Sequence, residues 1–435
     1  LRAEGQAPGL WLAPFCVRSD ARLYAEHPDW VVRDPETGAP APVWHHWGGP
    51  VYGLDLTHPA VLEHLRRLTA TLTVEWGFSV LKLDFLHFGA QPGTRHDPSC
   101  TGLEAVRRGL AAIREAAGID VHLLGCGAPM AASLGLVDSM RVGQDVGLSW
   151  RGDTPENMSS VSTMYACMNT VLRLWQHRTW WVNDPDCVLI RENGDAPPGV
   201  AGPAVTDPER RFLLTVVALT GGSTISGDSL RSLSAARWRQ LGQLLPPTGL
   251  AARWVGGFKP ALPDVLHLRI QTAWDAWHLV ALLNWDDAAH TVALPWRALG
   301  LGGPHELFDV WEGQPRPAVA GAFDQVLPPH GAALLALRPV REHPWLLGDD
   351  RHFAQGQAGV ADCRFEPAGQ TLVLELLPTP NRAGRLWLSV PAAYRVAEVQ
   401  GLEPGETWAE AGAGACRLDL EVRAPRVVHV RFMGA

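Results

Sequence analysis

The feature that most constrains the fold is a change in the pattern of apolar residues near position 250. Before it, short apolar runs bounded by Gly, Asp or Pro alternate with longer amphipathic stretches. Such runs are typical of buried parallel strands, and their alternation with helices predicts right-handed βαβ units around a parallel sheet. The strands are expected at 9–15, 79–86, 121–125, 139–142, 179–182 and 222–226.

The intervening stretches carry helix start signals. The stretch 59–76 has helical period and follows Thr57, which we expect to be its N-cap. The stretch 103–117 follows Thr101, and Glu104 three residues later completes a capping-box pattern. Both helices therefore have defined starts between predicted strands.

After position 250 the helical period almost disappears. Short strand-like runs separated by turns predict antiparallel β-sandwich modules, and 340–348, which contains Pro and His, is interpreted as a bridge between two of them. We therefore predict a parallel α/β domain at 1–250, a β-sandwich at 251–340 and a second β-rich domain at 341–435. The strands are expected at 267–272, 277–284, 290–295, 305–310, 332–337, 363–365, 371–377, 384–390, 394–401 and 427–432.

Composition removes several classes of function. The formal net charge of -8 gives no basic field for nucleic acid or anionic lipid. No run of 18 apolar residues is present, so no membrane span is expected. Seven scattered Cys without a C-x-x-C pair favour reduced thiols and a cytoplasmic location. The His spacings match no metal motif, and phosphate, dinucleotide and serine-hydrolase motifs are absent, so neither metal nor cofactor is expected.

Two carboxylates follow predicted strands, where catalytic groups of parallel α/β proteins lie. Lys82 and Asp84 should share one side of a strand, because side chains alternate along it. Arg141 and Asp145 follow a later strand. Two carboxylates at one barrel mouth suit glycoside cleavage, in which one attacks and the other protonates the leaving oxygen. The alternatives are a buried structural ion pair and Asp side chains that cap helices.

Further polar and aromatic residues lie near the same strand ends. Asp184 and Asp186 flank a Pro, and their carboxylates could accept from sugar hydroxyls or simply form an Asp-Pro turn and a helix cap. The chain has 19 Trp, and indole faces stack on pyranose rings, although for any single Trp a core position is the simpler interpretation. Those near the strand ends are Trp11, Trp44, Trp47, Trp150, Trp175, Trp180 and Trp181.

The order of motifs resembles the retaining α-galactosidases of glycoside hydrolase family 36 and, more loosely, those of the related family 27. Over residues 9–230 the matching segments occur in the order found in the family. They are GLWLAP (9–14), HPDW (27–30), LDLTHP (54–59), LKLDF (81–85), GCG (125–127), MRVGQDV (140–146), WVNDPDC (181–187) and SGDSL (226–230).

The resemblance implies a (β/α)8 TIM barrel followed by antiparallel β-sandwich domains, and it implies roles for single residues. Asp84 matches the nucleophile and Asp145 the acid/base. Lys82 and Arg141 match residues that bind sugar hydroxyls and keep the nucleophile ionised. Trp11 would line the pocket.

Three weaker correspondences complete the expected site. Cys126 is expected to contact the substrate, and Asp184 and Asp186 to shape the pocket. The implied partner is an oligosaccharide with a terminal α-D-galactosyl residue. No cofactor is implied, because two carboxylates suffice. The sequence is compatible with a homo-oligomer.

The chain also departs from the pattern of the family. The first two barrel strands and an Asp-Asp-Gly-Trp motif are not found, so we expect an N-terminally truncated barrel with low stability and weak activity. After Cys126 the chain has Gly127-Ala128-Pro129, where family 27 enzymes often carry bulkier or acidic residues, which leaves other sugars open. The alternatives are therefore a non-catalytic carbohydrate-binding protein and a related glycosidase of different specificity.

Overall fold

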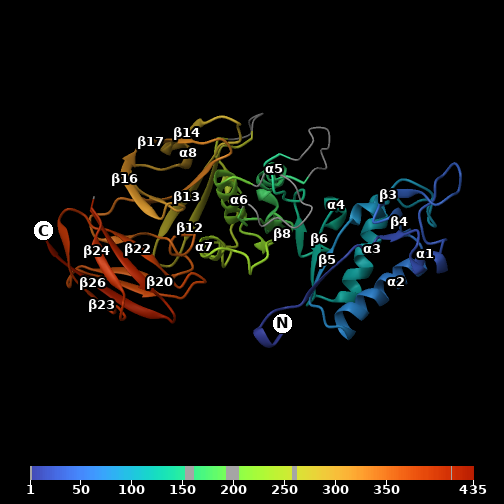
Figure 1. Cartoon of the computed structure of the whole chain (residues 1–435), viewed down its shortest axis with the longest axis horizontal. Helices are drawn as coiled ribbons and strands as arrows, with labels where there is room; N and C mark the ends of the chain where they lie inside the picture. The colour runs from blue at the N-terminus through green and yellow to red at the C-terminus, as the bar shows by residue number, and fades with distance from the viewer. Residues whose placement is uncertain (1, 152–160, 193–204, 257–261, 413) are drawn as a thin grey trace. The chain divides into compact units, whose positions relative to one another are not determined.

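The structure is a computed structural model that describes residues 2–151, 161–192, 205–256, 262–412 and 414–435 (Figure 1). The chain divides into two compact units. The N-terminal unit comprises residues 1–142 and 178–184, and the C-terminal unit comprises residues 143–177 and 185–435. The predicted domain boundaries at 250 and 340 stay a prediction.

A parallel five-stranded sheet organises the N-terminal unit. Its strands pair in chain order, as successive right-handed βαβ units require. They are β1 (Gly9–Leu12), β5 (Val80–Leu83), β6 (His122–Gly125), β7 (Ser139–Arg141) and β8 (Val182–Asp184). All five were predicted. The sixth predicted strand is β10 (Ile225–Ser226), which pairs in parallel with β9 (Cys187–Val188) in the C-terminal unit.

Two helices pack beside this sheet, as Figure 1 shows. α3 (Gly102–Ala117) starts with the predicted capping box of Thr101 and Glu104. α2 (Pro59–Ala70) continues into a π-helical turn, η2 (Thr71–Glu75). The predicted cap of α2 was wrong. His58 is the N-cap and accepts from the backbone N–H of Ala60, because the Thr57 hydroxyl donates to Asp55 instead, at 2.7 Å.

The remaining elements of the N-terminal unit are short. A three-stranded antiparallel sheet, which the sequence did not predict, has the order β2 (Cys16–Arg18), β4 (Gly49–Gly53), β3 (Pro42–His46). The helical segments are η1 (Arg2–Glu4), α1 (Arg22–Glu26), η3 (Leu86–Ala90) and α4 (Met130–Ser133). A shared core of leucines from the helices and the parallel sheet, among them Leu65, Leu81, Leu110 and Leu123, fixes the strand ends.

The C-terminal unit begins with helices. α6 (Asp207–Thr220) starts with a capping box formed by Thr206 and Glu209, and almost every side chain along it is buried. A helix buried on all sides is typical of the centre of a large core. The other helical segments are α5 (Thr163–Leu172), η4 (Leu174–Gln176) and α7 (Ala235–Gln243).

The rest of the C-terminal unit is antiparallel. The first module pairs β11 (Arg253–Trp254), β12 (Val265–Gln271), β13 (Ala276–Leu283), β18 (Ala332–Pro339), β15 (Pro304–Asp309) and β16 (Gln314–Ala320) in that order. β14 (His290–Pro295) and β17 (Ala322–Leu327) form a second sheet, and α8 (Trp296–Leu299) directly follows β14. Val280, Leu294 and Leu335 belong to one core between the two sheets, which is the layering of a β-sandwich.

Two four-stranded sheets end the chain and enclose another core. The segment 340–348 was predicted as a bridge, but a strand, β19, begins within it. Every residue of this strand, from Trp345 to Asp349, is buried. The sheets are β19 (Trp345–Asp349), β22 (Ala383–Ser389), β25 (Ala415–Glu421), β24 (Thr407–Glu410), and β20 (Val360–Glu366), β21 (Thr371–Leu376), β26 (Arg426–Gly434), β23 (Tyr394–Gln400). Within the part of the chain that the structure describes, no helix is both long and apolar enough to span a bilayer.

Candidate active site

The register of the parallel sheet brings four predicted site residues into one row. Asp84 and Cys126 each follow the last paired residue of β5 and β6, and Arg141 of β7 pairs with Asp184 of β8. The carboxyl ends of parallel strands meet at one edge of a sheet, which is where α/β enzymes place their catalytic groups. Arg141 and Asp184 are buried, whereas Asp84 is half-buried.

Lys82 and Trp11 lie two residues before this row, toward the amino ends of their strands. Trp11 of β1 is paired in register with Lys82 of β5. Lys82 and Asp84 are both half-buried, and they alternate with the fully buried Leu81 and Leu83. The alternation places the ammonium and the carboxylate on the same face of the strand, as the sequence predicted.

The Asp84 carboxylate accepts hydrogen bonds on both of its oxygens. Trp11 Nε1 donates to Oδ2 at 2.9 Å, and the backbone N–H of Phe85 donates to Oδ1 at 2.7 Å. Phe85 has a φ of 52°, which is uncommon for a bulky residue, and this left-handed turn allows its N–H to point back to the preceding side chain. Such outliers are concentrated at functional sites. The two donors fix the orientation of the carboxylate.

Cys126 supplies a third donor. Its thiol is buried and hydrogen-bonds the Asp84 carboxylate. Burial is the main cause that raises the pKa of this thiol; the Asp84 charge raises it further, and the Arg141 and Lys82 charges oppose the rise. The group is therefore a protonated S–H at neutral pH, able to donate. Gly127 follows with a φ of 53°, and a side chain there would begin 3.4 Å from Asp84 Oδ1.

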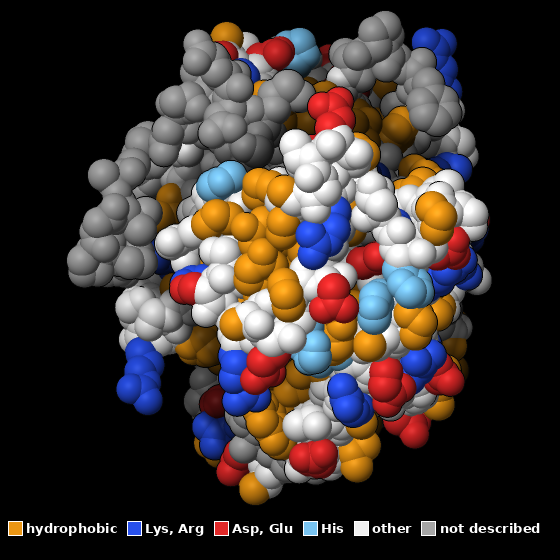
Figure 2. All heavy atoms as spheres, turned by 90° about the vertical axis from the view of Figure 1, so that its right-hand side faces the viewer, with side chains coloured by type: hydrophobic (Ala, Val, Ile, Leu, Met, Phe, Trp, Pro, Cys, Tyr) orange, Lys and Arg blue, Asp and Glu red, His pale blue; other side chains and the backbone are white. Residues whose placement is uncertain are grey.

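An aromatic cluster lies beside the carboxylate. The Phe85 ring has its centroid 6.3 Å from that of Trp11, 5.2 Å from Trp44 and 5.3 Å from Trp47. Trp11 is 48% exposed and Trp47 37% exposed, so both offer a face to a ligand. Figure 2 views the face that carries β3 and β4, where apolar side chains are interspersed with histidines and charged groups.

Not every tryptophan near a strand end is available. Trp150 and Trp181, candidates in the sequence, are 5% and 4% exposed and belong to the core. Trp150 and Trp181 are therefore core residues, whereas Trp175 and Trp180 are exposed.

Asp145 and Asp186 lie in the C-terminal unit. Asp145 is exposed, and its backbone carbonyl accepts from Ser162 N at 3.1 Å. Asp186 is buried at a φ of 77°, and its Oδ2 accepts from the backbone N–H of Val146 at 2.7 Å. The Asp186 carboxylate thus holds the backbone next to Asp145. The other six predicted site residues lie in the N-terminal unit.

Sequence reasoning missed two contributors near Asp84. The hydrogen bond from the backbone N–H of Phe85 could not be predicted from the sequence, because it depends on the left-handed turn at that residue. His87 is exposed, and its ring Nδ1 and backbone N both lie 2.8 Å from the Gly127 carbonyl, which fixes the loop after β6. Across the described residues, no group of three or more His, Cys, Asp or Glu is arranged to hold a metal ion.

Comparison with known proteins gives consistent results. Residues 271–337 match the alpha galactosidase C-terminal beta sandwich domain. An α-galactosidase from Thermus thermophilus, solved in complex with p-nitrophenyl α-D-galactopyranoside, is 33% identical with a TM-score of 0.50, over 59% of this chain and 50% of that one. The chain thus spans about half the length of the Thermus enzyme that it matches.

Two more distant structures share the fold. A family 27 β-L-arabinopyranosidase from Geobacillus stearothermophilus is 17% identical with a TM-score of 0.57, over 78% of this chain and 76% of that one. α-Galactosidase I from Mortierella vinacea is 16% identical with a TM-score of 0.52, over 78% of each chain. The fold class is therefore the predicted (β/α)8 type followed by antiparallel β-sandwich sheets. The chain is thus similar to α-galactosidases in the sequence of residues 271–337 and in its fold.

Proposed function

We propose that this protein is a glycosidase that hydrolyses terminal α-D-galactosyl residues of oligosaccharides with retention of configuration. The observation that carries the proposal is the Asp84 carboxylate, fixed by the indole of Trp11, the backbone N–H of Phe85 and the thiol of Cys126. A carboxylate held in a fixed orientation at a strand end is the group that a double displacement needs as its nucleophile. The 33% identity with an enzyme solved with an aryl α-galactoside supports the choice of sugar.

The proposed reaction has two steps. An oxygen of Asp84 attacks the anomeric carbon, the bond to the leaving oxygen breaks, and Asp145 gives its proton to that oxygen. Asp145, now a carboxylate, takes a proton from water, whose oxygen then attacks the anomeric carbon and releases Asp84. Both residues return to their starting states, so no cofactor is consumed. Retention requires the two carboxyl groups to be about 5–5.5 Å apart in the working enzyme.

The neighbouring side chains suit binding of the sugar. Lys82 and Arg141 can donate to hydroxyl groups, and Asp184 can accept from them. The exposed faces of Trp11 and Trp47 can stack on the apolar face of the pyranose. Asp186 would act through the backbone that it holds next to Asp145.

Replacement of Asp84 by Ala tests the proposal directly. Turnover of an aryl α-galactoside should be lost, and azide should restore it with formation of β-galactosyl azide, because the small anion enters the space of the missing carboxylate. Asp120→Ala, which removes an exposed carboxylate just before β6, is the matched control and should retain turnover. Full activity in Asp84→Ala, or an inverted sugar product from the unmodified enzyme, would contradict the mechanism.

The same assay separates the two alternatives that the sequence left open. A protein that binds galactose but turns over no glycoside would be a carbohydrate-binding protein. Faster turnover of aryl α-N-acetylgalactosaminide, β-L-arabinopyranoside or α-glucoside would keep the mechanism and change the specificity.

A further inference from the structure

A cavity of about 750 Å³ lies in the first β-sandwich module of the C-terminal unit. Its titratable lining groups come from four strands: Arg253 of β11, His267 and Arg269 of β12, His278 of β13 and His305 of β15. The lining contributed by the end of α8, by the loop that follows it and by β18 is uncharged, and the described lining contains no Asp or Glu. In a chain with net charge -8, this is a local excess of positive charge.

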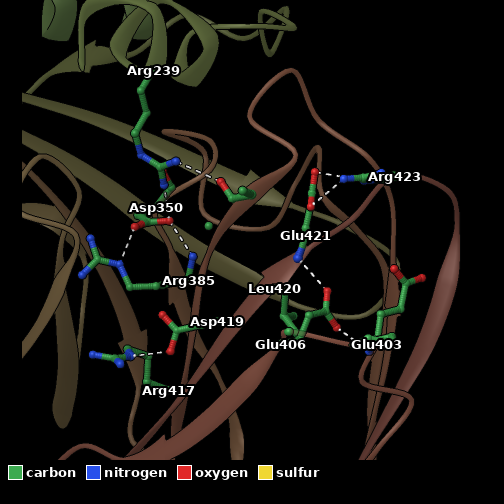
Figure 3. Close-up of a pocket in the computed structure, with 14 residues that line it drawn as sticks. Arg239, Asp350, Arg385, Glu403, Glu406, Arg417, Asp419, Leu420, Glu421 and Arg423 are labelled. Atoms are coloured by element: carbon green, nitrogen blue, oxygen red, sulfur yellow. Dashed lines mark hydrogen bonds and ion pairs between the residues drawn. The ribbon is translucent and has the colours of Figure 1, made fainter. Parts of the chain in front are cut away.

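A second cavity of the C-terminal unit, of about 810 Å³, differs from the first in how its arginines are paired (Figure 3). It is also rich in arginine, but its arginines are paired with carboxylates. Asp350 binds Arg239 at 2.6 Å and Arg385 at 2.8 Å, and Arg417 binds Asp419 at 2.9 Å. Its charges are therefore already compensated. Among the described residues, no carboxylate forms such an ion pair with Arg253 or Arg269.

Hydrogen bonds fix the histidines around the first cavity. Arg253 Nε donates to His267 Nδ1 at 3.4 Å, so that nitrogen is an acceptor and Nε2 carries the ring hydrogen. His267 Nε2 then donates to His278 Nδ1 at 2.7 Å, which leaves the hydrogen of His278 on Nε2. His305 Nδ1 donates to the Gly303 carbonyl at 3.3 Å, so its Nε2 becomes a second donor only on protonation. The cluster thus offers the Nε2 donor of neutral His278, and protonation of His305 adds a second Nε2 donor.

The histidines are neutral in the empty cavity. Burial, and after it the charges of neighbouring histidines and arginines, lower the pKa of His267 and of His278 to about 4. Burial also lowers the pKa of His305. A bound anion would reverse the effect of those charges and favour protonation.

We propose that this cavity is a binding site for a dianionic oxyanion, the phosphate group of a small molecule, held by Arg253, Arg269 and the imidazoles of His278 and His305. Arginine forks match the geometry of phosphate oxygens, and an uncompensated cationic pocket favours a doubly charged ligand. Phosphate itself and the phosphate group of a sugar phosphate share this chemistry.

Titration of the full chain with sulfate, phosphate and a hexose phosphate, followed by the ring-proton NMR signals of the histidines, tests the proposal. Sulfate and phosphate should each shift the His278 and His305 signals to saturation, whereas chloride at equal ionic strength should not. Tighter binding of the hexose phosphate than of phosphate would identify a sugar phosphate as the ligand, and equal binding would identify phosphate. Absence of a saturable shift, or the same shift with a neutral hexose, would overturn the proposal.

Single substitutions distinguish anion binding in this cavity from a general effect of the protein's charge. Arg253→Gln and Arg269→Gln each remove one exposed cation without opening the core, and each should weaken sulfate binding about tenfold. Arg364→Gln is the control, because Arg364 is 46% exposed and already paired with Asp362 and Glu375. It should bind sulfate like the unmodified protein, and an equal loss in this variant would contradict a localised site.

The pH dependence tests the histidines with sulfate, whose charge does not change near neutrality. Because binding favours protonated histidines, affinity should be higher at about pH 5 than at about pH 8, with uptake of protons on binding. Affinity that is independent of pH, or that rises with pH, would overturn the part assigned to His278 and His305.

Discussion

Asp84 in the N-terminal unit and Asp275 in the C-terminal unit show how similar contacts serve different ends. Both carboxylates accept an indole N–H at 2.9 Å, Asp84 from Trp11 and Asp275 from Trp345. The side chain of Asp275 is 3% exposed and also binds the guanidinium groups of Arg338 and Arg341. Asp84 is half-buried, and its other donors are a backbone N–H and a thiol.

The difference lies in how far the charge is compensated. At Asp275 two cations cancel the negative charge, and Arg338 also lies with its guanidinium carbon 4.0 Å from the ring centroid of Trp277. At Asp84 neutral donors orient the carboxylate without cancelling its charge. Asp275 should therefore contribute to stability and Asp84 to reactivity, and the two sites provide matched substitutions.

Asp84→Asn should give the largest effect. We expect turnover of an aryl α-galactoside to fall by a factor on the order of 10⁴ or more, because the nucleophile is lost. The free energy of unfolding should change by less than about 1 kcal/mol, since the group is half-buried. Steady-state kinetics and urea denaturation measure the two quantities. Unfolding of this variant together with loss of activity would make Asp84 a structural residue.

Asp275→Asn should show the reverse pattern. Removal of one partner leaves the buried Arg338 uncompensated, which should lower the free energy of unfolding by about 3–5 kcal/mol in urea denaturation. Turnover per folded molecule should stay unchanged. A stability equal to that of the unmodified protein would show that solvent reaches this ion pair.

Acidification should destabilise the C-terminal unit through His267 and His278. Their folded-state pKa values are lowered to about 4, below the ordinary 6.5, so the stability they provide is present above pH 6.5 and lost as pH falls toward 4. Without solvent screening the two histidines together would lose about 7 kcal/mol between these limits, and because both rings line a cavity that solvent can enter, the expected loss is about 3 kcal/mol. Thermal unfolding as a function of pH measures it. The double variant His267→Gln/His278→Gln should flatten the dependence, and an unchanged slope would place the acid sensitivity elsewhere.

Trp11→Phe should give the smallest effect. It keeps an aromatic ring but removes the donor to Asp84 Oδ2, so kcat should fall about tenfold while stability is retained. Trp345→Phe removes the equivalent bond to Asp275 and should lower the free energy of unfolding by about 1 kcal/mol without changing kcat. If Trp11→Phe changed KM alone, the indole would bind substrate rather than position the nucleophile.

Much of the N-terminal unit could be predicted from the sequence, because buried parallel strands have a strong local signal. Short apolar runs located β1, β5, β6, β7 and β8, and parallel register then requires their ends to meet in one row. The capping box located the start of α3. The start of α2 was missed because a His side chain provides the cap where Thr57 has another partner.

Other elements lack such signals. β16 has the sequence QPRPAVA, with prolines that argue against a strand and that are tolerated here at the end of its sheet. At the candidate site, the positions of Lys82 and Asp84 followed from side-chain alternation. The donor from Phe85 depends on a left-handed backbone turn at a bulky residue, which no residue pattern indicates.

If Asp84 is the nucleophile, it must become covalently bonded to the sugar during turnover. Reaction of the full chain with 5-fluoro-α-D-galactosyl fluoride, followed by proteolysis and mass spectrometry, tests it most directly by trapping the glycosyl-enzyme. The peptide containing Asp84 should carry the fluorogalactosyl group, and Asp84→Asn should carry none. A label on Asp145 or on another residue, or turnover with no trapped intermediate, would contradict the assignment of Asp84 as the nucleophile.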